Sequence, residues 1–275
     1  MNHTVEKPKG LILCATMRSG STMICEDFWN TKTLGKPEEY FNPWAKTKKH
    51  NWEKSYRHII QRSSDENGFV SIKIMANQLV SIGEGLQHLN ANQDNPLGTF
   101  FNNFKQYGFV YIKRRDIVKQ AISRYMAQIR NANHLQQNKG DFVPGGVISQ
   151  KELQEETLKA PFDLKRIQYH IQNIVCENTM WQHVFKTYNI PYFLIEYEDI
   201  AQHKNTNYLN TMCDYFGLNH VPDVYSKRTL QKMSNFNNQA LYDAFIDYST
   251  YENSKRNVKN RLWHAAYAHL RKYIN

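Results

Sequence analysis

The sequence predicts an α/β fold in which a mostly parallel central sheet is flanked by helices, giving three layers. Short apolar runs alternate along the chain with longer segments of helical periodicity. Such alternation is typical of βαβ crossovers, which bring successive strands into one parallel sheet. With 275 residues, 41% of them hydrophobic and 22% charged, the composition is that of a globular protein. We therefore expect a single domain over residues 1–275, with a core at about 10–200 and a helical C-terminal part at about 201–275.

The first strand is predicted at Gly10 to Ala15, a continuous apolar run of the kind that is buried on both faces of a parallel sheet. Asp116 should cap a later helix that runs to about Arg130, because an aspartate side chain accepts hydrogen bonds from a helix's first amides. The other predicted strands are 69–75, 108–113 and 192–196. The predicted helices are 21–32, 78–89, 117–130, 162–188, 205–216 and 255–273.

The charge balance favours an anionic partner, since 35 Lys and Arg residues stand against 25 Asp and Glu residues. A basic module that binds nucleic acid or an anionic surface is one interpretation. The basic residues form short clusters without a long tail, so we expect no nucleic-acid partner. No apolar window is long enough for a membrane span or a secretion signal. The four cysteines form no CxxC pair, so a cytoplasmic location is expected, and no spacing of His, Cys and Asp suits a metal.

Residues 15–22 run from the first strand into small and hydroxylated residues and then into a helix, which is the architecture of a phosphate-binding loop. Backbone amides and the positive end of the helix dipole would meet an anion there, next to Arg18. The loop departs from the pattern G-x-x-x-x-G-K-[ST], because Ser21 stands where the lysine should be. A small-molecule kinase with a degenerate loop is one interpretation, and a Ser/Gly turn that only caps a buried helix is another. Sheet and loop together indicate a P-loop-type fold.

Two further segments carry polar groups beside predicted strands and helices. Arg114 follows a strand and could clamp a phosphate with its planar guanidinium, with Ser123 nine residues further on in the next helix. Alternatively, Arg114 or Arg115 pairs with a surface carboxylate. Glu38 and Glu39 follow the first helix, and adjacent carboxylates suggest a general base, although a solvated turn is the simpler interpretation.

Taken together, these segments resemble the bacterial carbohydrate sulfotransferases typified by trehalose 2-sulfotransferase, which use 3′-phosphoadenosine 5′-phosphosulfate (PAPS). The family's motifs S-x-R-S-G-S-T, G-x-P-x-E-[FY]-F, K-[LI]-M/F-x-N-Q and R-x-D-x-V-x-Q-A-[VI]-S are matched in order by residues 16–22, 35–41, 73–78 and 114–123. The family's later E-x-x-W and Y-E-D motifs are similar to Glu177 to Trp181, with one extra residue, and to 197–199. Where relatives carry Arg-Gln and then Glu-Trp near the C-terminus, this chain has Lys232, and Ala240 with Leu241.

The resemblance implies a homodimeric enzyme that transfers a sulfuryl group from PAPS to a hydroxyl of a sugar or glycoconjugate and releases adenosine 3′,5′-bisphosphate. The transfer would be in line and independent of metal, because a sulfuryl group carries less charge than a γ-phosphoryl group. In this comparison, Glu39 falls on the position of the family's general base. Arg18 would bind the donor and stabilise charge on its leaving 5′-phosphate.

The donor-binding residues implied by the same comparison are the remaining loop residues and two residues of the later motif. They are Ser19, Gly20, Ser21 and Thr22, followed by Arg114 and Ser123 for the 3′-phosphate. Glu38 and Lys73 are expected to contact the acceptor. His134 and Trp181 fit no catalytic or metal pattern, so they are interpreted as surface or core residues.

Overall fold

The computed structural model describes residues 7–46, 51–90, 95–136, 142–145, 147–148, 160–231, 238–253 and 255. Its centre is a four-stranded parallel sheet in the order β2-β1-β3-β6. The strands are β1 (Gly10–Ala15), β2 (Val70–Met75), β3 (Gly108–Lys113) and β6 (Tyr192–Glu196). All four predicted strands are confirmed, and β2 begins one residue later than expected.

Helices occupy most of the remaining described chain. The labelled α-helices are α1 (Ser21–Thr31), α2 (Asn42–Lys46), α3 (Trp52–Ser63), α4 (Leu79–Asn90), α5 (Pro96–Phe104), α6 (Ile117–Arg130), α8 (Leu164–Thr187), α9 (Tyr197–Ile200) and α10 (Tyr208–Phe216), and residues 238–253 are also helical. The predictions for α1, α4, α6, α8 and α10 are confirmed within three residues at each end, whereas α2, α3, α5 and α9 were not predicted. Asp116 caps α6 as expected, accepting a hydrogen bond from the amide of Lys119 at 2.8 Å. Apart from Lys255, the helix predicted at 255–273 lies outside the described residues.

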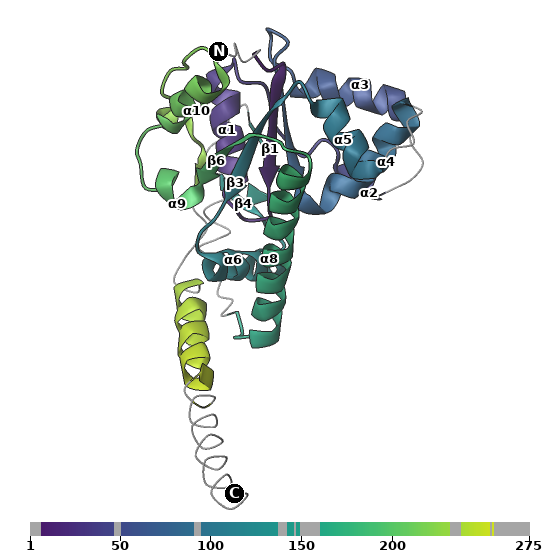
Figure 1. The fold of residues 1–275 in the computed structure, drawn as a ribbon. Helices are drawn as coiled ribbons and strands as arrows, with labels where there is room; N and C mark the ends of the chain where they lie inside the picture. Colours follow the sequence, from purple (N-terminus) through teal and green to yellow (C-terminus); the bar gives the residue numbers. More distant parts are fainter. Residues whose placement is uncertain are drawn as a thin grey trace, which may run out of the picture.

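The alternation of side chains along β1 divides the core into two clusters, one on each face of the sheet. Ile12 and Cys14 pack into the first cluster, while Leu11, Leu13 and Ala15 pack into the second. This is the period of two that a strand imposes on its side chains. In Figure 1, α3, α4 and α5 lie to one side of the sheet, and α1 and α10 lie to the other. The expected three-layer α/β architecture is therefore confirmed.

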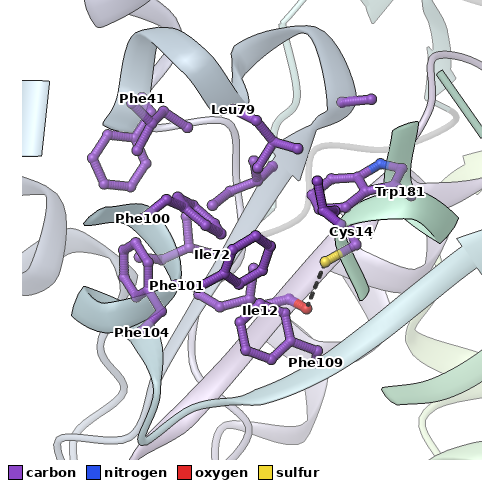
Figure 2. Packing of buried hydrophobic residues seen from close by; sticks show 14 of the residues in the cluster. Ile12, Cys14, Phe41, Ile72, Leu79, Phe100, Phe101, Phe104, Phe109 and Trp181 are labelled. Atoms are coloured by element: carbon purple, nitrogen blue, oxygen red, sulfur yellow. Dashed lines mark hydrogen bonds between the residues drawn. The ribbon is translucent and has the colours of Figure 1, made fainter. Parts of the chain in front are cut away.

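The first cluster is rich in aromatic rings. Figure 2 shows Phe100, Phe101 and Phe104 of α5 gathered against Ile12 and Ile72 of the sheet. Phe41 completes this side of the core, with its ring 6.3 Å from that of Phe104. Fully burying one such side chain stabilises the fold by about 1.5 to 3 kcal/mol.

A second, smaller sheet joins segments that lie far apart in the sequence. Its order is β5-β4-β7, with β4 (His134–Gln136), β5 (Val147–Ile148) and β7 (Leu230–Gln231). The pairing of β4 with β7 is antiparallel and brings the C-terminal segment beside the polar stretch that follows α6. No helix in the described part of the chain is both long and apolar enough to cross a membrane.

Candidate functional site

A cavity of about 1110 Å³ lies where the parallel strands end. Residues directly after β1, β2, β3 and β6 all line it: Arg18 and Gly20, Asn77 and Gln78, Arg114, and Tyr197. The strand order places β1 between β2 and β3, so the chain crosses from one side of β1 to the other at this point. Open α/β sheets bind ligands at such a switch point, beyond the carboxyl ends of the strands.

The loop between β1 and α1 has a backbone that few residues can adopt. Gly20 has φ 90° and precedes α1, and a Cβ atom there would lie 2.2 Å from Cδ2 of Tyr197. Arg18 also lies in the left-handed region, at φ 65°. The first amides of α1 have no carbonyl within the helix to bond. Gly20, Ser21 and Thr22 line the cavity, so the positive end of the helix dipole faces it.

Arg18 and Ser123, which the sequence predicted for the two phosphate groups of one donor, are in direct contact. Nε of Arg18 donates a hydrogen bond to Oγ of Ser123 at 3.0 Å, and its NH1 donates to the carbonyl of Asn133. Burial and the nearby charge of Arg114 lower the pKa of Arg18 to about 10. Arg18 and Arg114 carry like charges and line the same cavity, so a polyanion that bound there would offset their repulsion.

Arg114 and Arg115 are adjacent in sequence but have different surroundings. Arg115 forms ion pairs with Glu196 at 2.6 Å and Asp199 at 2.5 Å. Arg114 lines the cavity, and its guanidinium carbon lies 5.0 Å from the ring centre of Tyr197. Nε of Arg114 is buried and pairs with the Glu198 carboxylate at 3.6 Å, which is too long for a hydrogen bond, and it has no hydrogen-bond partner among the described residues. Both arginines therefore pair with carboxylates, as the alternative interpretation expected, but of the two only Arg114 also lines the cavity.

Glu39 also lines the cavity and contacts Lys73 of β2. Its Oε1 atom is 3.0 Å from Nζ of Lys73, whose side chain is 8% exposed. Its Oε2 atom accepts a hydrogen bond from the amide of Gln78 at 3.4 Å. Burial disfavours the charge of Lys73, but the acidic groups around it, Glu39 and Glu38 among them, raise its pKa overall. Lys73 also donates to Oγ1 of Thr22 at 3.4 Å, which links the carboxylate to the first turn of α1.

The two adjacent glutamates are not equivalent. Burial raises the pKa of Glu38, although the charges of Arg62 and Lys73 oppose this shift. The backbone carbonyl of Glu38 accepts a hydrogen bond from the amide of Lys73 at 3.1 Å, which fixes the loop against β2. Both glutamates line the cavity. The Glu39 carboxylate contacts both Lys73 and Gln78, so it is held in a defined position.

The structure brings nine of the ten predicted site residues to this one cavity. They are Arg18, Gly20, Ser21, Thr22, Glu38, Glu39, Lys73, Arg114 and Ser123. Ser19 is the exception: its side chain is fully buried, it does not line the cavity, and its hydroxyl has no hydrogen-bond partner among the described residues.

Sequence reasoning missed His134 as a cavity residue. Burial, together with the charges of Arg18 and Lys73, lowers the pKa of His134 to about 3, so the imidazole is neutral near pH 7. Lys119 and Arg228 also line the cavity and were not singled out. Lys119 follows Arg114 by five residues, which was a usable signal because both lie in the same motif. His134 begins β4 and Arg228 lies two residues before β7, so the pairing of these strands brings both to the cavity, which no local pattern indicated.

Positive charge is in excess around the cavity. Its described lining contains Arg18, Lys73, Arg114, Lys119 and Arg228, against the carboxylates of Glu38, Glu39 and Glu177. A cavity lined in this way concentrates anions, and planar guanidinium groups suit phosphate and sulfate oxygens. The site therefore fits a ligand with several negative charges beside a smaller region that carries carboxylate and amide groups.

Comparison with known families gives one match. The family model described as Stf0 sulphotransferase matches residues 10–246, which is most of the chain and includes every residue of the cavity. The comparison with curated proteins gave no match.

Proposed function

The chain belongs to the Stf0 sulphotransferase family, and we propose that it transfers a sulfuryl group from PAPS to a hydroxyl of a sugar or glycoconjugate. The observation that carries the proposal is the pair Arg18 and Arg114 on one cavity, beside the amino end of α1. A ligand with phosphate groups at both ends of its ribose would separate these two guanidinium groups and neutralise them. Residues 1–275 would act as one domain, since Val221 and Val224 share a core cluster with β1.

The donor would be held by groups that already face the cavity. Arg114 and Ser123 would bind the 3′-phosphate, and the buried Nε of Arg114, which makes no hydrogen bond among the described residues, supports this assignment. The amides of Gly20, Ser21 and Thr22 would bind the 5′-phosphate at the positive end of α1. Binding would exchange the hydrogen bond between Arg18 and Ser123 for bonds from each residue to the donor. PAPS, when bound, supplies the activated sulfuryl group.

The acceptor would lie near Glu39. The acceptor's hydroxyl oxygen forms the new bond to sulfur while the bond between sulfur and the bridging oxygen of the 5′-phosphate breaks. The hydroxyl proton passes to the Glu39 carboxylate, and the negative charge that develops on the leaving phosphate is stabilised by Arg18 and the loop amides. Lys73 and Gln78 hold the carboxylate in place, and Lys73, which also contacts Thr22, would interact with the transferred group.

Ligand-induced thermal shifts test the donor. At one hundred times the dissociation constant, a ligand that binds only the native state stabilises it by about 2.7 kcal/mol. Adenosine 3′,5′-bisphosphate should therefore raise the melting temperature by several degrees, and adenosine 5′-monophosphate, which lacks the 3′-phosphate, should do so much less. ATP with magnesium is the test for the kinase interpretation. Equal shifts with all three nucleotides would contradict the proposed 3′-phosphate site.

The acceptor class needs a direct assay. Radiolabelled PAPS would be incubated with the protein and with panels of free sugars, glycolipids and glycans, and label transfer would be measured. We expect transfer to at least one carbohydrate class. Labelling of proteins or simple phenols instead, with no labelled carbohydrate, would contradict the proposed acceptor.

A further inference from the structure

Side chains of α6 and α8 donate hydrogen bonds to the end of β1 and to the start of the phosphate loop. The indole N–H of Trp181 donates to the carbonyl of Ala15 at 3.0 Å. Gln120 donates to Oγ1 of Thr16 at 2.9 Å and to the carbonyl of Met17 at 2.8 Å. These contacts join residues that are more than one hundred positions apart in the sequence.

A buried ion pair completes this set of contacts. Nε of Arg124 donates to the carbonyl of Met17 at 3.0 Å, and its two terminal nitrogens bond both oxygens of Glu177, at 3.1 and 2.5 Å. The Arg124 side chain is only 5% exposed. Planar, bidentate pairing of this kind leaves the guanidinium little rotational freedom. The position of Met17 is therefore fixed by α6, and α6 is fixed to α8 through the same arginine.

We propose that Gln120, Arg124, Glu177 and Trp181 act as positioning residues that hold the loop in the conformation that binds the donor. They will be called the loop brace. The inference rests on the proposed function, because it concerns the donor site of that reaction. None of the four was assigned a role in the reaction above.

Two features of the loop require such support. Arg18, the residue after Met17, has φ 65°, a conformation that is strained for a non-glycine residue and persists only where neighbours fix it. In addition, the carbonyl of Met17 accepts hydrogen bonds from both Gln120 and Arg124. Both of its lone pairs are then directed into the protein, so this carbonyl does not face and repel a bound polyanion.

The competing explanation is that these residues only tie helices together. Trp181 is fully buried and also belongs to the first core cluster, so its loss could lower stability without affecting the loop in particular. The structure offers a matched control. Trp44 belongs to the same cluster and donates its indole N–H to Ser55 at 2.8 Å, away from the loop.

The test therefore compares Trp181→Phe with Trp44→Phe. Each substitution keeps an aromatic ring and removes one buried N–H donor. Amide hydrogen exchange would be measured for peptides that cover residues 15–22, and the affinity for adenosine 3′,5′-bisphosphate would be measured by calorimetry. Exchange needs no ligand, so it decides the inference even if wild-type protein fails to bind the bisphosphate, a result that would count against the proposed function alone.

We expect Trp181→Phe to accelerate exchange in the loop and to weaken bisphosphate binding by about 3- to 10-fold, the effect of losing one buried hydrogen bond. Trp44→Phe should change neither, even if it lowers the melting temperature as much. Gln120→Leu removes the other neutral donor and should likewise accelerate loop exchange and weaken bisphosphate binding. It replaces Trp181→Phe in the test if that variant does not fold. Unchanged loop exchange in the folded brace variants, or equal changes in Trp44→Phe, would overturn the inference.

Discussion

Replacing Glu39 by Gln is the most direct test of the proposed base. The substitution keeps the size of the side chain and its capacity for hydrogen bonds but removes the charge and the basicity. In the structure, it converts the 3.0 Å ion pair with Lys73 into a contact between an ammonium group and a neutral amide. Two effects follow, one on catalysis and one on stability, and they must be measured separately.

The size of each effect can be worked out from the geometry. A general base contributes about 10²- to 10⁴-fold to turnover, so kcat should fall by that factor. Two unit charges 3.0 Å apart attract by about 5 kcal/mol at an effective dielectric constant of 20 and by about 1.4 kcal/mol in water. The Glu39 side chain is 30% exposed, and Gln can still accept a hydrogen bond from Lys73. We therefore expect the free energy of unfolding to fall by about 1 to 3 kcal/mol.

The assay follows transfer of radiolabelled sulfate to a verified carbohydrate acceptor, well below the melting temperature of the variant. Bisphosphate affinity should change little, because Glu39 does not contact the proposed phosphate sites. Glu38→Gln is the matched control and should keep most of the activity, since its carboxylate lacks the contacts with Lys73 and Gln78. Near-normal kcat in folded Glu39→Gln would refute the base assignment and leave positioning by the loop and by Arg18 as the main source of catalysis.

Three further predictions follow. Arg114→Ala should weaken bisphosphate binding about 10- to 100-fold. Arg115→Ala removes an exposed side chain, so it should lower stability little and leave affinity nearly unchanged. Calorimetry giving the reverse order of affinities would contradict the clamp. The pKa of His134 is lowered in the folded state, so the unfolded chain binds the extra proton and stability must fall as pH drops below about 6.5. Between about pH 7 and pH 5.5, the free energy of unfolding should fall by about 1 kcal/mol less in His134→Asn than in the wild-type protein, as measured by denaturant unfolding. Identical pH profiles of stability for the two proteins would contradict a neutral imidazole. Gly20→Ala should destabilise the protein by about 1 to 3 kcal/mol more than Gly68→Ala. Both glycines have positive φ, but only at Gly20 would the added Cβ atom meet a side chain, that of Tyr197. Equal melting temperatures of the two variants would count against this clash.

The strands could be predicted because each buried strand of a parallel sheet is a short apolar run with a clear end. The helices that were not predicted have no such distinct pattern in the sequence. Residues 96–104 begin with Pro-Leu-Gly-Thr and read as a turn, yet Asn95 caps α5 through the amide of Gly98 at 2.8 Å, and Pro96 takes the first helical position. Burial of Phe100, Phe101 and Phe104 in the core then stabilises a helix whose own residues favour it only weakly.

The candidate site could be predicted where its residues directly follow strands. Arg18 and Arg114 come after β1 and β3, which are neighbours in the sheet, so their convergence follows from the topology alone. The choice between Arg114 and Arg115 could not be made in the same way. It depends on Glu196 and Asp199, which lie more than eighty positions further along the chain and meet Arg115 only when β6 pairs with β3.

The C-terminal part of the cavity lining, at residues 225–231, was the least predictable part of the site, and the reason lies in α1. Glu26 and Asp27 follow the phosphate loop on a helix that is otherwise packed against the sheet, and both are buried. Asp27 accepts two hydrogen bonds from Arg228, at 2.7 and 2.6 Å, and Glu26 accepts from the amide of Thr229 at 2.6 Å. Buried carboxylates in an apolar helix do require partners, but the sequence could not say which of 35 Lys and Arg residues supplies one. That partner is 201 positions away, so α1, which follows the phosphate loop, also fixes a C-terminal segment that lines the same cavity.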